Sequence, residues 1–407
     1  MPTESPWPSI LQRRRVLVCA GPGGVGKTTT AAALAVLGAR SGRRVAALTV
    51  DPARRLADSL GIRDPGARAE ELDPRIWQAP GQAASGGRLS VMMMDTKRTF
   101  DELIERHASS PQARDRILNN RLYGYVSSHL AGAHEYMAME KLLSVSQDGA
   151  FDLIVLDTPP TRDALDFLSA PERLVSALDS SVLGWLGQAF HPTRGLTLGL
   201  LARGVSRVLG TMGRITGREL LEQLAHFIVD LNELFGGFRQ RAAAVARAFR
   251  GSEFGFVLVS SPRTAALDEG LRLGRQLHLE GMTLDGFVVN RMPLSGGAAS
   301  SAEVARALAE RLPAWDRRAA TASLEAIVRV AAQQSSRSRE SRQRVEALRA
   351  TLDALGRTPA PALFFLPELP ADVQGIASLH ELAQALLQPV EGIGPVEPTG
   401  ARGSEQP

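Results

Sequence analysis

Residues 21–30 read GPGGVGKTTT, and this stretch constrains the fold more than any other part of the chain. Gly21, Gly26, Lys27 and Thr28 satisfy the phosphate-binding pattern G-x-x-x-x-G-K-[ST], with an apolar run before it and a helical pattern after it. Glycines are needed there because backbone N–H groups must approach phosphate oxygens closely. The order strand, loop, helix therefore predicts an α/β protein with a nucleotide site.

Seven short apolar runs have the composition of buried parallel strands. They are residues 15–20, 44–50, 89–95, 151–157, 254–260, 284–290 and 362–367. Because helical patterns separate most of them, we expect a P-loop NTPase with a mostly parallel, doubly wound sheet. Helical insertions are predicted at 97–147 and 161–250, forming an inserted helical subdomain within a single domain of residues 1–388. Residues 389–407 are rich in Pro and Gly, which predicts a disordered tail.

The composition argues against several classes of protein. With 44% hydrophobic and 22% charged residues, the chain reads as globular. No apolar run reaches the roughly 18 residues of a membrane-spanning helix, and the N-terminus lacks a signal-peptide core, so we expect a cytoplasmic protein. The net charge is only +4, and the triplet Arg13–Arg15 reads as a solvated edge, so no nucleic acid is expected as a partner.

The loop also predicts how phosphates and a metal would be held. Lys27 supplies a positive charge for the β- and γ-phosphates of a nucleotide, and the Thr28 hydroxyl would hold Mg²⁺. The helix that begins at Lys27 adds its positive N-terminal dipole. The predicted cradle comprises Gly23, Gly24, Val25, Gly26, Lys27, Thr28 and Thr29.

Two aspartates follow predicted strands, and we expect them beside the loop because ligands bind outside the carboxyl ends of parallel strands. Asp157 ends the run LIVLD, where a carboxylate can orient magnesium and its waters. Asp51 follows the second strand, where it could contribute to the metal shell and position or deprotonate the attacking water. Taken alone, an aspartate at a strand end is more often a turn residue or a helix cap.

The neighbouring motifs support the catalytic interpretation. GGVGKTT, DPARRLADSL, FDLIVLDTPPTRDALDFLSAPERL and VVNRMP together resemble the ArsA/Get family of ATPases, within the dimeric deviant-Walker P-loop class. This family includes the arsenite-pump ATPase and the ATPase that targets tail-anchored proteins. The resemblance spans roughly residues 15–385 and implies a magnesium-dependent ATPase that forms a homodimer, or a heterodimer with a paralogous ATPase.

The resemblance also assigns roles to individual residues. Asp51 matches the switch I aspartate that activates water, and Asp157 opens the switch II segment. Asn290 matches the asparagine that reads adenine, although a turn residue after a strand is the alternative. Pro367, Glu368 and Leu369 match the loop that encloses the base, which favours ATP over GTP. Residues 162–164 read Arg-Asp-Ala, where the family usually has Gly-His-Thr.

Two further departures from the family concern cysteine and position 22. The single cysteine, Cys19, leaves no C-x-x-C pair for zinc and no metalloid-binding cysteines. Pro22 occupies the place of the family's signature lysine, which reaches the partner subunit's phosphates, and proline carries no charge. We therefore expect slow hydrolysis in isolation, unless a paralogous partner or a nearby cation compensates. The local candidates for such a compensating cation are Arg54, Arg55, Arg162 and, more weakly, Lys97.

Residues 180–218 contain no acidic side chain and mix large apolar residues with arginines and glycines. Such a stretch suits a groove for a hydrophobic helix or a contact with a membrane surface, and the corresponding region of the targeting ATPases forms the client groove. Packing into an ordinary helical core or a dimer interface is the alternative. Three downstream roles stay open: handling of a hydrophobic or membrane-protein client, energising an anion transporter, or a low-turnover ATP-binding scaffold paired with an active paralogue.

Overall fold

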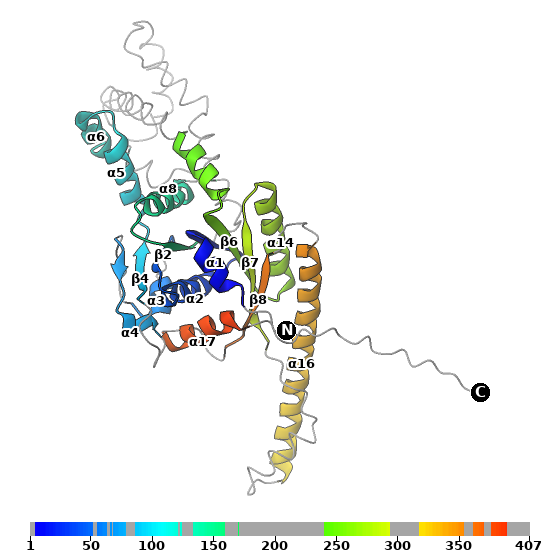
Figure 1. Ribbon diagram of the computed structural model, residues 1–407. Helices are drawn as coiled ribbons and strands as arrows, with labels where there is room; N and C mark the ends of the chain where they lie inside the picture. Colours follow the sequence, from blue (N-terminus) through cyan, green and yellow to red (C-terminus); the bar gives the residue numbers. More distant parts are fainter. Residues whose placement is uncertain are drawn as a thin grey trace, which may run out of the picture.

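The computed structural model describes residues 5–51, 55–62, 66, 68–78, 86–120, 123, 133–158, 170, 240–293, 317–353, 361–369 and 376–388. These residues form an eight-stranded sheet with helices on both of its faces (Figure 1). In chain order the elements are α1 (Trp7–Arg13), β1 (Val16–Ala20), α2 (Lys27–Arg40), β2 (Arg44–Thr49), α3 (Arg55–Leu60), β3 (Glu70–Glu71), α4 (Pro74–Trp77), β4 (Arg88–Met93), α5 (Thr96–His107), α6 (Pro111–Leu118), α8 (Ala133–Gln147), β5 (Leu153–Asp157), β6 (Phe254–Ser260), α14 (Thr264–Leu279), β7 (Leu284–Met292), α16 (Arg317–Asp353), β8 (Ala362–Pro367) and α17 (Ile376–Leu387).

The strands lie in the order β3-β4-β2-β5-β1-β6-β7-β8, and all neighbours pair in parallel except β3, which runs antiparallel to β4. β1 lies between β5 and β6. After β1 the chain forms β2, β3, β4 and β5 on one side of it, and β6, β7 and β8 then extend the sheet on the other side. A crevice forms outside the carboxyl ends of the strands at such a switch point. This topology is an α/β P-loop NTPase fold and confirms the predicted fold class.

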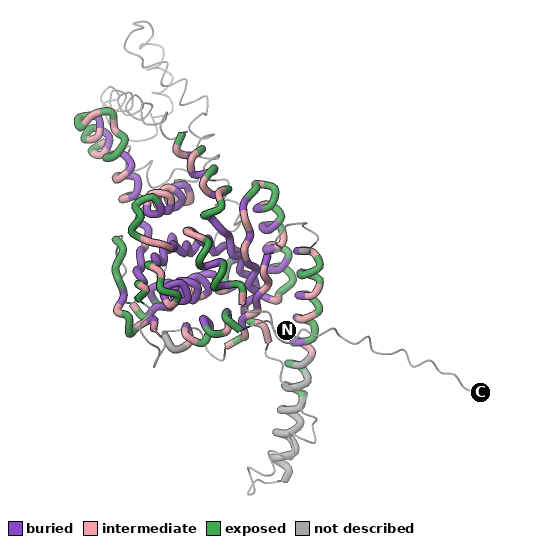
Figure 2. Tube along the Cα trace, in the orientation of Figure 1, coloured by how far each residue is buried: buried purple, intermediate pink, exposed green. Residues whose placement is uncertain are grey.

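Alternate side chains of each central strand enter two separate cores. In β1, Leu17 and Cys19 pack with α1, α2 and α17, whereas Val16 and Val18 pack with α8, α14 and the C-terminal part of α16. The strands are therefore buried on both faces, and Figure 2 shows the central strands and α2 mostly in the colour of buried residues. Burial on both faces explains why the strands read as continuous apolar runs in the sequence.

The predicted strands agree with the observed ones to within two residues at either end. β3, a two-residue edge strand, was not predicted. α5, α6 and α8 occupy the first predicted insertion, while the second, at 161–250, lies outside the described residues except for 170 and 240–250, of which 240–249 are helical. The tail at 389–407 also lies outside them, so the domain boundaries stay a prediction. Among the described helices, none is long and apolar enough to cross a membrane.

Arg14 shows that the basic triplet is not simply a solvated edge, as the sequence had suggested. Its Nε and Nη2 donate to Asp285 Oδ2 and Oδ1 at 2.8 and 2.7 Å, and it also donates to the Ser252 carbonyl. The two side chains are only 11% and 6% exposed. This bidentate pair ties the start of β1 to β7, 271 residues away in the chain, so short-range sequence patterns could not reveal it.

Asp285→Ala is expected to destabilise the fold by about 3–5 kcal/mol, because it leaves the Arg14 guanidinium buried without its carboxylate. Urea denaturation followed by circular dichroism measures the change in the free energy of unfolding. Glu71→Ala is the control, since the Glu71–Arg88 pair is 3.6 Å long and more than half exposed on both sides, and its loss should change stability by at most about 1 kcal/mol. Equal effects of the two substitutions would contradict this assignment.

Candidate active site

The glycine-rich loop joins β1 to α2 at the switch point of the sheet. Gly26 has φ 97° and is the N-cap of α2, where a Cβ would overlap the Asn290 amide. Gly21 has φ 148° and lies against the Val259 carbonyl, so a side chain is excluded there too. Since no side chain caps α2, the N–H groups of its first turn are free to hold an anion. Gly23 and Gly24 at the tip of the loop are exposed.

Lys27, the first residue of α2, is folded back over this loop. Its side chain is buried, and Nζ donates to the carbonyl oxygens of Gly21 and Pro22, both at 2.9 Å. Burial lowers the pKa of Lys27, while the negative charges of Asp157 and Glu269 oppose that effect. The ammonium thus lies within the cradle itself, and it can exchange two carbonyl contacts for phosphate oxygens by a side-chain rotation.

The two predicted aspartates lie close together, and Thr49 links them. Asp157 ends β5 with no exposed surface, and its Oδ2 accepts a hydrogen bond from Thr49 Oγ1 at 3.1 Å. The same hydroxyl accepts from the backbone N–H of Asp51 at 3.2 Å. Asp51 is 4% exposed, and Arg55 Nη1 lies 3.4 Å from its Oδ2. Sequence reasoning missed Thr49, whose one signal is a hydroxyl at the carboxyl end of an apolar strand.

Asp157 fits the requirements of a metal shell. Its Oδ1 is buried and has no hydrogen-bond partner among the described residues. Burial raises the pKa of Asp157 to about 6, although the hydroxyls of Thr28 and Thr49 and the charge of Lys27 work in the opposite direction. A buried carboxylate with an unused oxygen gains a partner when a cation and its waters bind beside it. Thr28, in the first turn of α2, is half-buried next to this group.

The residues predicted for the base lie on the other side of the loop. Asn290, buried in β7, donates from Nδ2 to the Val25 carbonyl at 2.9 Å and accepts at Oδ1 from the N–H of Arg291. Pro367 ends β8 opposite Met292, and the Glu368 N–H donates to the Met292 carbonyl at 2.8 Å. Leu369 packs against the core. The structure therefore brings the end of β8 to the same edge of the sheet as Asn290 and the cradle.

A cavity of about 440 Å³ lies alongside the loop. The loop forms one wall with Pro22, Gly23, Gly24 and Val25, and Glu368 contributes from the end of β8. Further lining comes from Arg263, which precedes α14, Arg291 of β7, and Arg337 and Arg344 of α16. The local sequence around these arginines carries no pattern that identifies them as neighbours of the loop. Glu269 and Glu340 also line the cavity, and Arg344 pairs with Glu340 at 3.3 Å, so the lining has only a small excess of positive charge.

The candidate cations for position 22 lie in different places. Pro22 itself is buried and lines the cavity. Lys97 is on α5, where it forms an ion pair with Asp101 at 2.8 Å. Arg54 and Arg162 lie outside the described residues. Arg55 is therefore the candidate that the structure places against a predicted catalytic group.

Comparison with known proteins adds an independent finding. A family described as anion-transporting ATPase matches residues 14–307. An uncharacterised protein of Streptomyces coelicolor is 29% identical over 280 residues, which cover 68% of this chain and 62% of that protein. The protein named ATPase get3 of Schizosaccharomyces pombe is 28% identical over 278 residues, covering 67% of this chain and 72% of its own length. ATPase GET3 of Ajellomyces dermatitidis is 28% identical over 291 residues, or 70% and 75% of the two chains.

Proposed function

The chain belongs to the anion-transporting ATPase family, and from that membership we propose that it is a magnesium-dependent ATP hydrolase of the ArsA/Get type. One observation supports this most directly: the Thr49 hydroxyl connects Asp51 to Asp157 beside a glycine cradle that holds Lys27. This arrangement supports the proposal, because ATP hydrolysis needs a metal-shell carboxylate, a proton acceptor and a phosphate-binding cation around one crevice.

Each of these residues has a distinct task in the proposed reaction. The N–H groups from Gly23 to Thr29 and the Lys27 ammonium bind the phosphates of ATP, and Thr28 and Asp157 would hold Mg²⁺ and its waters. Bound magnesium would neutralise charge on the β- and γ-phosphate oxygens. Asp51 orients the attacking water and accepts its proton, while Thr49 ties the Asp157 carboxylate to the backbone of Asp51.

The adenine base lies on the other side of the loop in this proposal. Asn290 is already adjacent to Gly26, and its amide turns from the Val25 carbonyl toward the base edge when ATP binds. Pro367, Glu368 and Leu369 close the base pocket, which is supported by their position beside Met292 at the same edge of the sheet. The cavity lined by Glu368 and the loop provides a route for the nucleotide.

We further propose that the protein works as a dimeric nucleotide switch, either with itself or with a paralogue, and that ATP binding and release change a surface for a hydrophobic or membrane-protein client. The support is the composition of residues 180–218, which lie outside the described part of the chain. The description of the matched family favours a second candidate, the energising subunit of an anion transporter. A low-turnover scaffold is the third, and the buried, uncharged Pro22 favours it.

Lys27→Ala tests whether the loop binds nucleotide. A hydrogen bond from a charged group contributes about 1.5–3 kcal/mol, so its loss should raise the Kd for ATP–Mg²⁺ roughly 10- to 100-fold and leave no measurable turnover. Titration calorimetry gives the Kd. Arg75→Ala is the control, because it removes a positive charge from a side chain that is 90% exposed on α4. Unchanged ATP affinity in Lys27→Ala would contradict the proposed role of the loop.

A further inference from the structure

Arg55 occupies a fixed position at the start of α3. Leu56, Ala57 and Leu60 of this short helix are buried, and Leu56 and Leu60 join the same core as α2. The Ser59 hydroxyl donates to the Arg55 carbonyl at 2.8 Å, which holds the first turn of the helix. The backbone of Arg55 is thus anchored beside the crevice, while its side chain stays 56% exposed and able to move.

Arg55 lies against one of the two proposed catalytic carboxylates. Its Nη1 lies 3.4 Å from Oδ2 of the buried Asp51. The Thr49 hydroxyl links the backbone of Asp51 to Asp157, beside the loop that holds Lys27. The Arg55 guanidinium is therefore in contact with the carboxylate that, in the proposed reaction, orients the attacking water.

Stability does not account for this arrangement. An ion pair with one half-exposed partner contributes only about 0–1 kcal/mol to folding, because solvent screens it. Pro22 adds no positive charge to the loop and is buried. Arg55 is consequently well placed to act on a ligand and contributes little to the stability of the fold. Mutation of Arg55 can therefore test an effect on catalysis without unfolding the protein.

We propose that Arg55 is a catalytic residue that donates hydrogen bonds in cis to the γ-phosphate of ATP as it is transferred to water. This inference rests on the proposed ATPase function and adds a residue to it. The water oxygen forms a bond to the γ-phosphorus, the bond from that phosphorus to the β–γ bridging oxygen breaks, and Asp51 accepts the proton of the water. The products are ADP and inorganic phosphate. The Arg55 guanidinium leaves Asp51 and stabilises the charge on the transferred phosphoryl oxygens.

The exposure of Arg55 limits the size of this effect. Arginines donated into a closed P-loop site increase the rate about 10³–10⁵-fold. A side chain that is half in water should contribute less, since solvent weakens its field. We therefore expect Arg55 to sustain the slow turnover of the isolated protein, with roughly a 10- to 100-fold effect on kcat.

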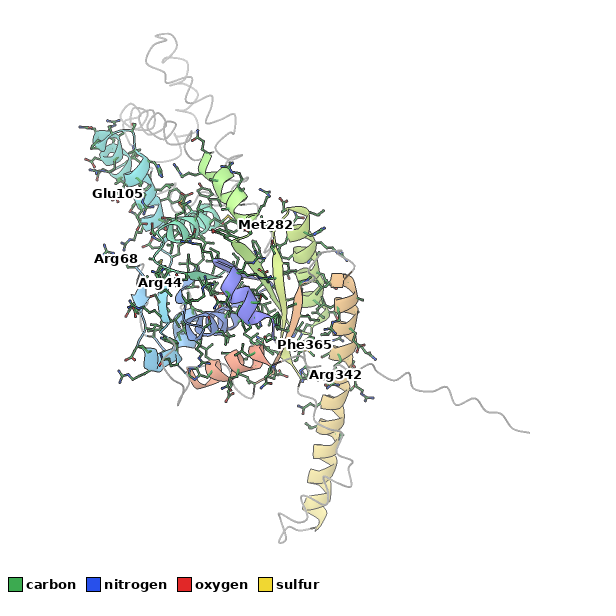
Figure 3. The ribbon with its side chains drawn as sticks, in the orientation of Figure 1. Arg44, Arg68, Glu105, Met282, Arg342 and Phe365 are labelled. Carbon is green, nitrogen blue, oxygen red and sulfur yellow. The ribbon has the colours of Figure 1, made fainter. Side chains whose placement is uncertain are left out.

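The test compares Arg55→Ala and Arg55→Lys with Arg44→Ala in the full-length protein. Arg44, labelled in Figure 3, is a matched control because its side chain is 49% exposed and pairs with an aspartate, Asp152. It differs in position, since Arg44 begins β2 and Asp51 follows the opposite end of that strand. Three quantities are measured for each variant: kcat for ATP, the Kd for ADP, and the capture of ADP with aluminium fluoride, which mimics the transferred phosphoryl group.

Arg55→Ala should lower kcat, leave the Kd for ADP unchanged and lose the aluminium fluoride complex, whereas Arg55→Lys should retain part of both activities. Arg44→Ala should match the wild type in all three measurements. If the wild type hydrolyses ATP and Arg55→Ala does so equally fast, Arg55 has no catalytic role and the proposed ATPase function is unaffected. If the wild type is no faster than Lys27→Ala, the proposed function is wrong and the role of Arg55 with it. Loss of ADP binding in Arg55→Lys as well as in Arg55→Ala would overturn the catalytic assignment in favour of a structural one.

Discussion

Asp51→Asn is expected to bind ATP–Mg²⁺ like the wild type and to hydrolyse it about 10²–10⁴-fold more slowly, the range typical of a lost general base. The amide has the shape of the carboxylate but cannot accept the proton of the attacking water. The hydrogen bond to Thr49 comes from the backbone of Asp51, so the substitution preserves the link to Asp157. The measurements are phosphate release at saturating ATP and nucleotide titration of the same preparation.

The control for Asp51→Asn is Asp115→Asn, the same chemical change on α6 at a side chain that is 59% exposed. It should leave both turnover and binding unchanged. Wild-type turnover by Asp51→Asn would show that another group accepts the proton, and the assignment of Asp51 would then be wrong. A higher Kd for ATP together with wild-type phosphate release at saturating ATP would instead assign Asp51 to binding alone.

Pro22→Lys is expected to raise the ATPase rate of a homodimer by about 10³-fold or more, because a cation donated across a dimer to the transferred phosphate is worth about 10³–10⁵ in P-loop enzymes. The structure allows this substitution. The contact of Lys27 with residue 22 is to its backbone carbonyl, which any residue supplies. The cavity beside Pro22, Gly23 and Gly24 offers a path for the stem of the new side chain.

Mixing experiments separate action in trans from action in cis. A Pro22→Lys/Lys27→Ala double variant should be inactive alone yet accelerate the wild-type protein when the two are mixed, since it donates its lysine without hydrolysing ATP. Pro22→Ala is the control for loop conformation and should hydrolyse at the wild-type rate. Equal acceleration by Pro22→Ala would mean that the rigidity of proline, and not the missing charge, limits the wild type. An unchanged rate for Pro22→Lys in isolation, with acceleration only of an added paralogue, would identify a heterodimer.

The sequence predicted the sheet well because its strands are buried on both faces and so appear as unbroken apolar runs between helical patterns. β3 was beyond such reasoning, since two glutamates at an exposed edge carry no apolar signal. The packed side of α16 also follows from a local pattern, because Val345, Leu348 and Leu352 recur at three- and four-residue steps and all three are buried.

The candidate site was predictable where it follows from local pattern, and less so where it depends on tertiary contacts. The loop and the two strand-end aspartates carry recognisable motifs, and the topology of the sheet brings them together. Thr49 was missed because a threonine in an apolar strand is common, and only its partners reveal that it links the Asp157 carboxylate to the backbone of Asp51. Arg337 and Arg344 of α16 were missed because they reach the cavity from a helix about 310–320 residues further along the chain.

The most direct test of this account is phosphate release by the purified wild-type protein, measured beside Lys27→Ala and Asp51→Asn with magnesium and with a chelator in its place. We predict slow turnover by the wild type that requires magnesium and exceeds that of both variants, while Asp51→Asn still binds ATP. Turnover by the wild type that is no faster than by the two variants, or that is equally fast without magnesium, would contradict the proposal that this loop and these two aspartates form an ATPase site.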